Sequence, residues 1–421
     1  MTGRQTSSKR SGRGATAVRP APTGWSLLED MLARPKASWY LVLVSSVLLL
    51  GLGVLMVLSS SSVYSSAMYR GNPYYFAKRQ LLFLVMGLPI AWWLSRQQAA
   101  RLKVLGWVAF LGSLVLLLAI FVPGLGDDSG KGNLAWLRIG PVTIQPSEFA
   151  KLGLVMWSAA LVSTKQKVLD RPRELAPLIL GFGLVEALVL MQGDLGTGLV
   201  IGAIIFSILY VIGVPLRMLG ALLGVGLVAV AAMVVTSPNR MRRIYNFITG
   251  QPDLSASQQP MSAIYALASG GWWGRGLGGS RQKWGGLNDG AQNDFVFAVI
   301  GEELGLLGTL TVLALFAVLG FAGLRIAMRA DSIFIRVLAA GTTCWIMFQA
   351  LVNMGVAMKL LPVVGVPLPF ISYGGSALMA NLFAVAILLA CARQEPAARK
   401  ARARTAGEPR PKVTTVVDGG R

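Results

Sequence analysis

Long apolar runs separated by polar segments dominate the chain. Apolar runs of about 17–25 residues recur, which is the length that an α-helix needs to cross the hydrocarbon core of a bilayer. The pattern predicts ten membrane-spanning helices, at about residues 39–58, 79–95, 104–122, 148–163, 175–191, 198–213, 218–236, 295–322, 335–356 and 376–392. The predicted fold is therefore an all-α integral membrane protein. An even number of spans places both termini on the same side of the membrane.

The segments between the predicted spans differ in length on the two sides of the membrane. The longer ones lie on one side, at about residues 59–78, 123–147, 237–294 and 357–375. The loop at about 237–294, between spans seven and eight, is long enough to be functional rather than connective. Both ends of the chain are polar and basic, so residues 1–38 and 393–421 are predicted to be disordered tails that flank a membrane domain at 39–392.

Composition and charge agree with this picture. The chain is 54% hydrophobic and only 14% charged, which excludes an ordinary soluble protein of this length. Its net charge is +21, and 26 of its 39 Lys and Arg residues fall in the two tails and the alternate short loops. The positive-inside rule assigns that side to the cytoplasm. The positive charge therefore indicates topology and attraction to anionic lipids, and no nucleic-acid partner is expected.

Two residue types limit the chemistry. Histidine is absent, so any general acid or base must be Asp, Glu, Lys or Tyr. The two cysteines, Cys344 and Cys391, lie in apolar segments and indicate neither a disulfide framework nor a cysteine metal site.

The stretch GGLNDGAQNDFVFAVIGEELGLLG places carboxylates at the outer end of span eight. Asp294 begins the span, where the helix dipole favours a negative charge, so it is either a helix-end carboxylate or a catalytic group. Glu302 lies about 12 Å further along the helix than Asp294, at 1.5 Å per residue. The two cannot form a hydrolase pair, because the carboxyl groups of such a pair are about 5–9.5 Å apart. Glu302 and Glu303 are predicted to hold helices together or to line a polar cavity.

Two shorter motifs begin other spans. In IQPSEFAK, Glu148 and Lys151 are spaced i,i+3 and predict a local ion pair, with Lys151 facing an anionic lipid headgroup as the functional alternative. In QGDLGTG, Asp194 is placed to cap span six after a tight glycine turn.

The loop before span eight contains SGGWWGRGLGGSRQKWGG. Its glycines allow close approach to a ligand, and Arg275, Arg281 and Lys283 supply positive charge. The tryptophans, Trp272, Trp273 and Trp284, are predicted either to lie at the membrane interface or to stack on sugar rings. The following outer loop, LPVVGVPLPFISYGGS, has three prolines that prevent a continuous helix and indicate a re-entrant plug or a groove lining.

These motifs, in this order, resemble the SEDS family (shape, elongation, division and sporulation proteins) over residues 39–395. The opening LMVLSSSSV and NPYYFAKRQLLFL are more similar to its division-type, FtsW-like members. The resemblance implies a ten-span peptidoglycan glycosyltransferase of the GT-C type that acts on lipid II. It also implies a class B penicillin-binding protein transpeptidase and other divisome proteins as partners, in the bacterial plasma membrane at the division septum.

The resemblance also implies site residues. The family's essential aspartate corresponds to Asp294, while its usual histidine two residues earlier is Gln292, and Asp289 has no assigned role. Asp294 is the predicted catalytic base. The predicted substrate-binding residues are Gln145, Glu148, Lys151, Asp194, Arg275, Arg281 and Lys283. A divalent cation, Mg²⁺ or Mn²⁺, is left open as a cofactor, without assigned ligands.

Two alternatives differ in function class. A lipid II flippase or transporter predicts ionisable groups near the bilayer midplane and inverted repeats. Glu186 fits the first expectation weakly, and the sequence has no clear repeat. A scaffold that only recruits partners would give no purpose to intramembrane charges such as Lys151 and Glu302.

Overall fold

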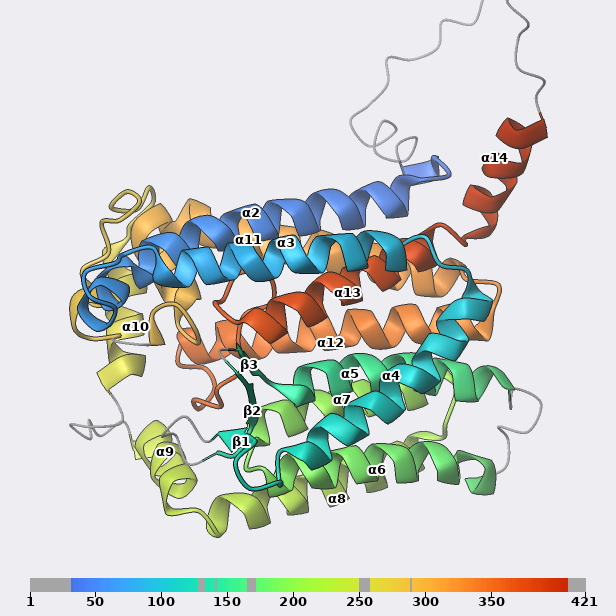
Figure 1. Cartoon of the computed structure of the whole chain (residues 1–421), viewed down its shortest axis with the longest axis horizontal. Coiled ribbons are helices and arrows are strands. Elements are labelled where there is room, and N and C mark those ends of the chain that lie inside the picture. The colour runs from blue at the N-terminus through green and yellow to red at the C-terminus, as the bar shows by residue number, and fades with distance from the viewer. Residues whose placement is uncertain are drawn as a thin grey trace, which may run out of the picture.

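Long helices make up the core of the computed structural model, which describes residues 32–127, 133–140, 142–164, 172–249, 258–287 and 290–407. Within these residues ten long helices form one bundle (Figure 1): α2 Ala37–Met68, α3 Tyr75–Leu94, α4 Ala99–Ala119, α5 Pro146–Thr164, α6 Ala176–Met191, α7 Leu195–Val211, α8 Leu216–Val235, α11 Val296–Arg329, α12 Ile333–Ala357 and α13 Gly375–Ala392. Each lies at a predicted span. Six of them, α2, α4, α8, α11, α12 and α13, are long and apolar enough to cross a membrane. The multi-pass helical fold is confirmed, and the count of ten spans stays a prediction.

The helices differ in how deeply they are buried. Nearly all of α5 and α13 is buried, and these two helices pack with α12 at the centre of the bundle. At the periphery, α8 buries only Leu219 and Val234, and it exposes apolar side chains such as Val228, which is 70% exposed. Exposed apolar surface of this extent marks contact with lipid.

The two ends of the bundle carry different structures (Figure 1). The N-terminal end of α2 and the last helix, α14 Pro396–Gly407, lie at one end. At the other lie two short helices of the long loop, α9 Pro238–Thr249 and α10 Gln258–Ser269, together with a small sheet. We call this the loop end. The described part of the chain thus starts and finishes at the same end, as an even number of spans requires, and the prediction assigns that end to the cytoplasm.

A small antiparallel sheet was not predicted from the sequence. It is formed by β1 Gly126–Asp127, β2 Trp136–Ile139 and β3 Val142–Ile144, in that order, and Leu137 of β2 pairs with Ile144 of β3. Strands this short contain too little alternation of apolar and polar residues to be recognised from the sequence. The sheet lies in the predicted loop 123–147 and leads directly into α5.

Helical structure extends beyond the predicted spans, most clearly after Leu58 and after residue 392. The tail after residue 392 was predicted to be disordered, but α14 is helical, because Ala, Arg and Lys are good helix formers. Helix α2 continues past the predicted end at Leu58 to Met68. Its serines are compatible with the helix because they are hydrogen-bonded locally, as in Ser60 Oγ to Met56 O (2.6 Å). Residues 1–31 and 408–421 of the predicted tails lie outside the described residues.

Candidate functional site

Asp294 lies at the loop end, two residues before α11 begins at Val296. It is half-buried, whereas its neighbours Gln292 and Phe295 are buried. Its backbone carbonyl accepts a hydrogen bond of 2.9 Å from Nδ2 of Asn353 on α12. A carboxylate near a helix N-terminus is stabilised by the helix dipole.

The loop between α12 and α13 fixes the two residues that precede Asp294. The Tyr373 amide donates to the carbonyl of Gln292 (2.8 Å), and Oγ of Ser372 donates to the carbonyl of Asn293 (2.6 Å). Three consecutive carbonyls are therefore held from outside α11. The position of Asp294 is set by this loop and by α12.

The same loop is non-helical between Leu361 and Gly374, as its prolines predict. Leu368, Phe370 and Ile371 are almost completely buried, which favours the plug interpretation of this segment. Burial raises the pKa of the Tyr373 phenol to about 12. Tyr373 therefore stays protonated at neutral pH and does not compete with Asp294 as a base.

Lys151 lies inside the bundle. Its Nζ is 2.8 Å from Oε1 of Glu148, and both side chains are 1% exposed, which confirms the predicted i,i+3 ion pair. Oε1 of Gln349 accepts from Lys151 Nζ (2.9 Å) and from Nε1 of Trp345 (2.8 Å). The structure thus places the ammonium group within the protein and not at a surface that faces lipid headgroups.

A polar stripe on α12 connects this cluster with Asp294. Gln349 and Asn353 are one turn apart, and their side-chain amides donate to the carbonyls of Pro367 (3.0 Å) and Val366 (2.8 Å). Asn353 also holds Asp294, as described above. This stripe was not predicted, although two amides spaced i,i+4 within an apolar span are a recognisable signal in the sequence.

Gln145 and Asp194 form a second junction at the loop end. Asp194 caps α7, as predicted, by accepting from the amide (3.0 Å) and the hydroxyl (2.7 Å) of Thr197. The side chain of Gln145 donates from Nε2 to Asp194 Oδ2 (3.0 Å). Its backbone N–H donates to Oγ of Ser376 at the start of α13 (3.2 Å). These two residues therefore tie α5, α7 and α13 together.

Helix α11 is broken at Gly305, which has φ +68° and ψ −163°. Only glycine adopts this conformation readily. The break leaves backbone groups without partners in the helix, and residues 271–276 of the long loop supply them. The four hydrogen bonds are Arg275 N to Glu302 O (2.9 Å), Gly276 N to Glu303 O (3.0 Å), Leu306 N to Gly271 O (2.9 Å) and Leu307 N to Trp272 O (3.3 Å). The loop thus completes the hydrogen bonding of both halves of α11.

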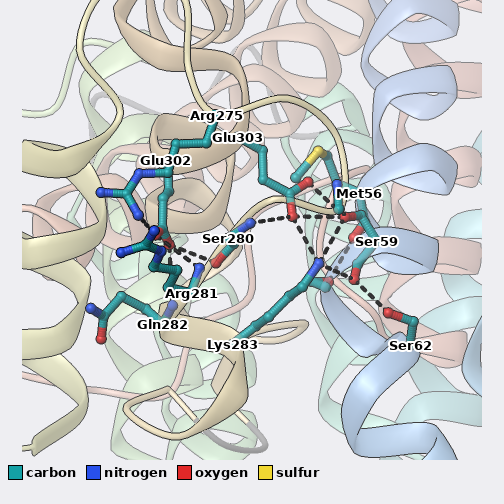
Figure 2. A network of polar contacts seen from close by, with 12 residues as sticks. Met56, Ser59, Ser62, Arg275, Ser280, Arg281, Gln282, Lys283, Glu302 and Glu303 are labelled. Atoms are coloured by element: carbon teal, nitrogen blue, oxygen red, sulfur yellow. Dashed lines mark hydrogen bonds and ion pairs between the residues drawn. The ribbon is translucent and has the colours of Figure 1, made fainter.

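The side chains before the break hold the same loop (Figure 2). Glu302 accepts from Oγ of Ser280 (2.6 Å) and from the amide of Arg281 (2.9 Å). Glu303 accepts from Oγ of Ser59 on α2 (2.6 Å) and pairs with Nζ of Lys283 (3.0 Å). Both glutamates are completely buried. They hold the loop and α2 against α11, in agreement with their predicted role in shaping the bundle.

The three predicted substrate-binding cations of this loop therefore differ in accessibility. The Lys283 side chain is 2% exposed and is neutralised by Glu303. The Arg275 side chain is 33% exposed, 3.8 Å from Glu302, and Arg281 is exposed. Arg275 and Arg281 are the two that offer accessible positive charge.

Replacing Gly305 with alanine is expected to destabilise the protein by roughly 1–3 kcal/mol or more, because the backbone conformation is strained for any residue with a Cβ. The new Cβ would also lie 2.6 Å from the Trp272 carbonyl oxygen. Thermal unfolding in detergent measures the effect. Gly51→Ala is the matched control, since this α2 position has open space around it. Equal stability of the two variants would contradict the account of the break.

The described residues contain no group of three or more His, Cys, Asp or Glu side chains placed to hold a metal ion. Cys344 and Cys391 are free cysteines. Asp289, which had no assigned role, lies outside the described residues.

Comparison with known proteins now identifies the family. The model of the cell cycle protein family FTSW_RODA_SPOVE matches residues 40–397. The chain belongs to the FtsW/RodA/SpoVE family. The resemblance to SEDS proteins is thus confirmed.

Individual members of the FtsW/RodA/SpoVE family match nearly the whole membrane domain. The "Probable peptidoglycan glycosyltransferase FtsW" of Mycobacterium tuberculosis is 36% identical over 369 residues, covering 87% of this chain and 70% of that protein. "Stage V sporulation protein E" of Bacillus subtilis is 35% identical over 362 residues, covering 84% and 96%. A solved structure described as "Structural coordination of polymerization and crosslinking by a peptidoglycan synthase complex" has a TM-score of 0.66 at 29% identity, covering 83% and 97%.

Proposed function

We propose that this chain is a peptidoglycan glycosyltransferase that polymerises lipid II into β-1,4-linked glycan strands for the septal cell wall. The observation that carries this conclusion is its similarity to relatives named as peptidoglycan glycosyltransferase FtsW, at 36% identity over 87% of the chain. The site supports the same chemistry, because a half-buried aspartate lies at the loop end of the bundle and its backbone carbonyl is held by Asn353.

Asp294 is the proposed general base. The 4-hydroxyl of the acceptor GlcNAc attacks the anomeric carbon of the donor, and its proton passes to the Asp294 carboxylate. The new C–O bond forms as the bond to undecaprenyl pyrophosphate breaks, and the leaving group departs with the electron pair. In-line displacement inverts the anomeric centre and gives the β linkage. A positioned base contributes about 10²–10⁴-fold to such a step.

The departure of the leaving group is helped by nearby positive charge and does not require protonation by an acid. Pyrophosphate is a good leaving group, so cations that neutralise its developing charge are sufficient. Arg275 and Arg281 fit this role because their side chains are accessible. Lys151, Lys283, Glu148, Asp194 and Gln145 are proposed to shape the site through the internal contacts described above. The divalent cation left open by the sequence, Mg²⁺ or Mn²⁺, would add positive charge beside the pyrophosphate, and no residue in the described part of the chain is assigned to hold it.

A transpeptidase is the proposed partner. The solved synthase complex that this chain resembles coordinates polymerization with crosslinking, which supports a penicillin-binding protein beside this chain. We propose that it is of class B and that the pair works with other divisome proteins at the septum, with both tails in the cytoplasm. A fluorescent fusion that stays evenly distributed around dividing cells would contradict the septal assignment.

Asn353 is proposed to position the base. Asn353→Leu removes the donors to Asp294 and Val366, so kcat is expected to fall while the KM for lipid II stays within about twofold. Steady-state kinetics test this, with Asn239→Leu at an exposed position of α9 as the control. A general structural defect would instead change both constants or lower the yield of folded protein.

The flippase alternative is separated from the polymerase by one experiment. Proteoliposomes receive fluorescent lipid II, and both transbilayer movement and polymer are measured, with and without the cognate transpeptidase. The proposal predicts polymer without accelerated movement of lipid II. Movement without polymer would support the transporter.

A further inference from the structure

In α2 and α11, the part of the helix that is suited to the hydrocarbon core of the membrane ends at the same level of the bundle. Residues 306–329 of α11, after the break, span about 36 Å at 1.5 Å per residue, enough to cross a hydrocarbon core of about 30 Å without the first part of the helix. In α2, the apolar run ends at Leu58 and serines follow. Ser59 donates a hydrogen bond to Glu303, two residues before Gly305. The end of the apolar run in α2 therefore lies level with the break in α11. Together they mark the membrane boundary at the loop end.

The long loop exposes large apolar side chains at this boundary. Trp272, Trp273, Leu277 and Trp284 are 67%, 82%, 60% and 71% exposed, and we call these four residues the tryptophan surface. The Trp272 carbonyl accepts from the amide of Leu307, which fixes one edge of this surface to the first turn of α11 after the break.

The tryptophan surface continues a surface that faces lipid. Leu306, Leu307 and Leu310, in the turns of α11 that follow the break, are 42%, 41% and 47% exposed. Apolar side chains exposed on this span contact acyl chains in a membrane. Trp272, whose carbonyl accepts from the Leu307 amide, therefore lies where the headgroups begin.

The loop is also held in place, so its tryptophans do not fold back onto the protein. Glu302 and Glu303 bind it through Ser280, Arg281 and Lys283, and the backbone bonds to both halves of α11 fix its other side. Positive charge from Arg275 and Arg281 lies on the same segment. Aromatic rings beside cations are the combination that favours the bilayer interface, where rings meet headgroups and cations meet lipid phosphates.

We propose that the tryptophan surface inserts into the headgroup region of the leaflet at the loop end, so that the long loop is anchored in the lipid interface. The occupant of this surface is the phospholipid bilayer itself, because the surface is continuous with the lipid-facing side of α11. Anchoring there holds the break in α11 at a fixed height. Asp294, at the start of the same helix, is thereby kept at a constant distance from the lipid surface.

Site-specific fluorescence tests the proposal in proteoliposomes. In a background of Cys344→Ala and Cys391→Ala, single variants Trp273→Cys, Leu310→Cys and Gln258→Cys are labelled with an environment-sensitive fluorophore. Leu310 is the lipid-facing control on α11. Gln258 is the water-facing control, since it is exposed at the first residue of α10, whereas the last residue of that helix, Ser269, is the one that lies against Glu302 near the break.

The expected result is a blue-shifted label at Trp273 that loses emission to spin-labelled lipids, as the label at Leu310 does, and is protected from iodide. The label at Gln258 should show the opposite behaviour. A label at Trp273 that iodide quenches as it does at Gln258, with no quenching by lipid, would overturn the proposal. A third outcome is protection from iodide that appears only after the cognate transpeptidase is added, without quenching by lipid. This would show that the surface binds a protein, and it would also overturn the proposal. Monodisperse elution of each variant confirms folding.

Discussion

Replacing Asp294 with asparagine is expected to lower the rate of glycan polymerisation by about 10²–10⁴-fold, because an amide cannot take the proton of the acceptor hydroxyl. The fold should survive the change, since asparagine has nearly the same size and shape as aspartate and the backbone contacts at residues 293 and 294 remain. Loss of a carboxylate near a helix N-terminus costs only about 0.3–1 kcal/mol. Polymer formed from purified lipid II, separated by length, measures the effect.

A matched control separates loss of the base from loss of charge. Asp331→Asn makes the same chemical change at an exposed position beyond the other end of α11 and should leave the rate unchanged. Polymerisation by Asp294→Asn at the wild-type rate would remove Asp294 as the base. A well-folded but inactive Asp294→Asn variant, beside an active Asp331→Asn variant, would support the assignment.

Removing one partner of the buried Lys283–Glu303 pair is expected to give the largest loss of stability. Glu303→Gln leaves the Lys283 ammonium buried, at 2% side-chain exposure, without its counter-charge. An uncompensated buried charge costs about 3–5 kcal/mol. The thermal unfolding transition in detergent should move to a clearly lower temperature.

The double variant Glu303→Gln/Lys283→Met is the control for this prediction. It removes both charges, so it should recover most of the stability lost in Glu303→Gln, as replacement of a whole buried pair often does. Additive losses from the two substitutions would show that the pair is not coupled. The account in which Glu303 and Lys283 hold the long loop against α11 would then fail.

The helices could be predicted because a bilayer requires about 20 apolar residues for each span, and this requirement is visible in the sequence. The i,i+3 pair of Glu148 and Lys151 and the cap at Asp194 were predictable for a similar reason, since both are local geometry. Contacts between residues far apart in the chain were harder to predict. Nothing local indicates that Ser59 meets Glu303 or that Asn353 holds Asp294.

The predicted cations show what sequence reasoning lacked. The positive charge that a pyrophosphate needs is carried by Arg275, Lys283 and Lys151. A sequence does not show which of these cations is already neutralised by a carboxylate. In the structure Glu148 neutralises Lys151 and Glu303 neutralises Lys283. The break at Gly305 was also missed, because the glycine lies within a continuous apolar pattern and its conformation depends on a loop that packs against it.

Polymerisation of purified lipid II by the purified chain with its cognate transpeptidase tests the central claim most directly. The product is digested with a muramidase that cuts only β-1,4 linkages to GlcNAc. The account predicts long glycan strands that the enzyme degrades completely to disaccharide units. Intact lipid II after prolonged incubation with the folded complex, or a polymer that resists the muramidase, would contradict it.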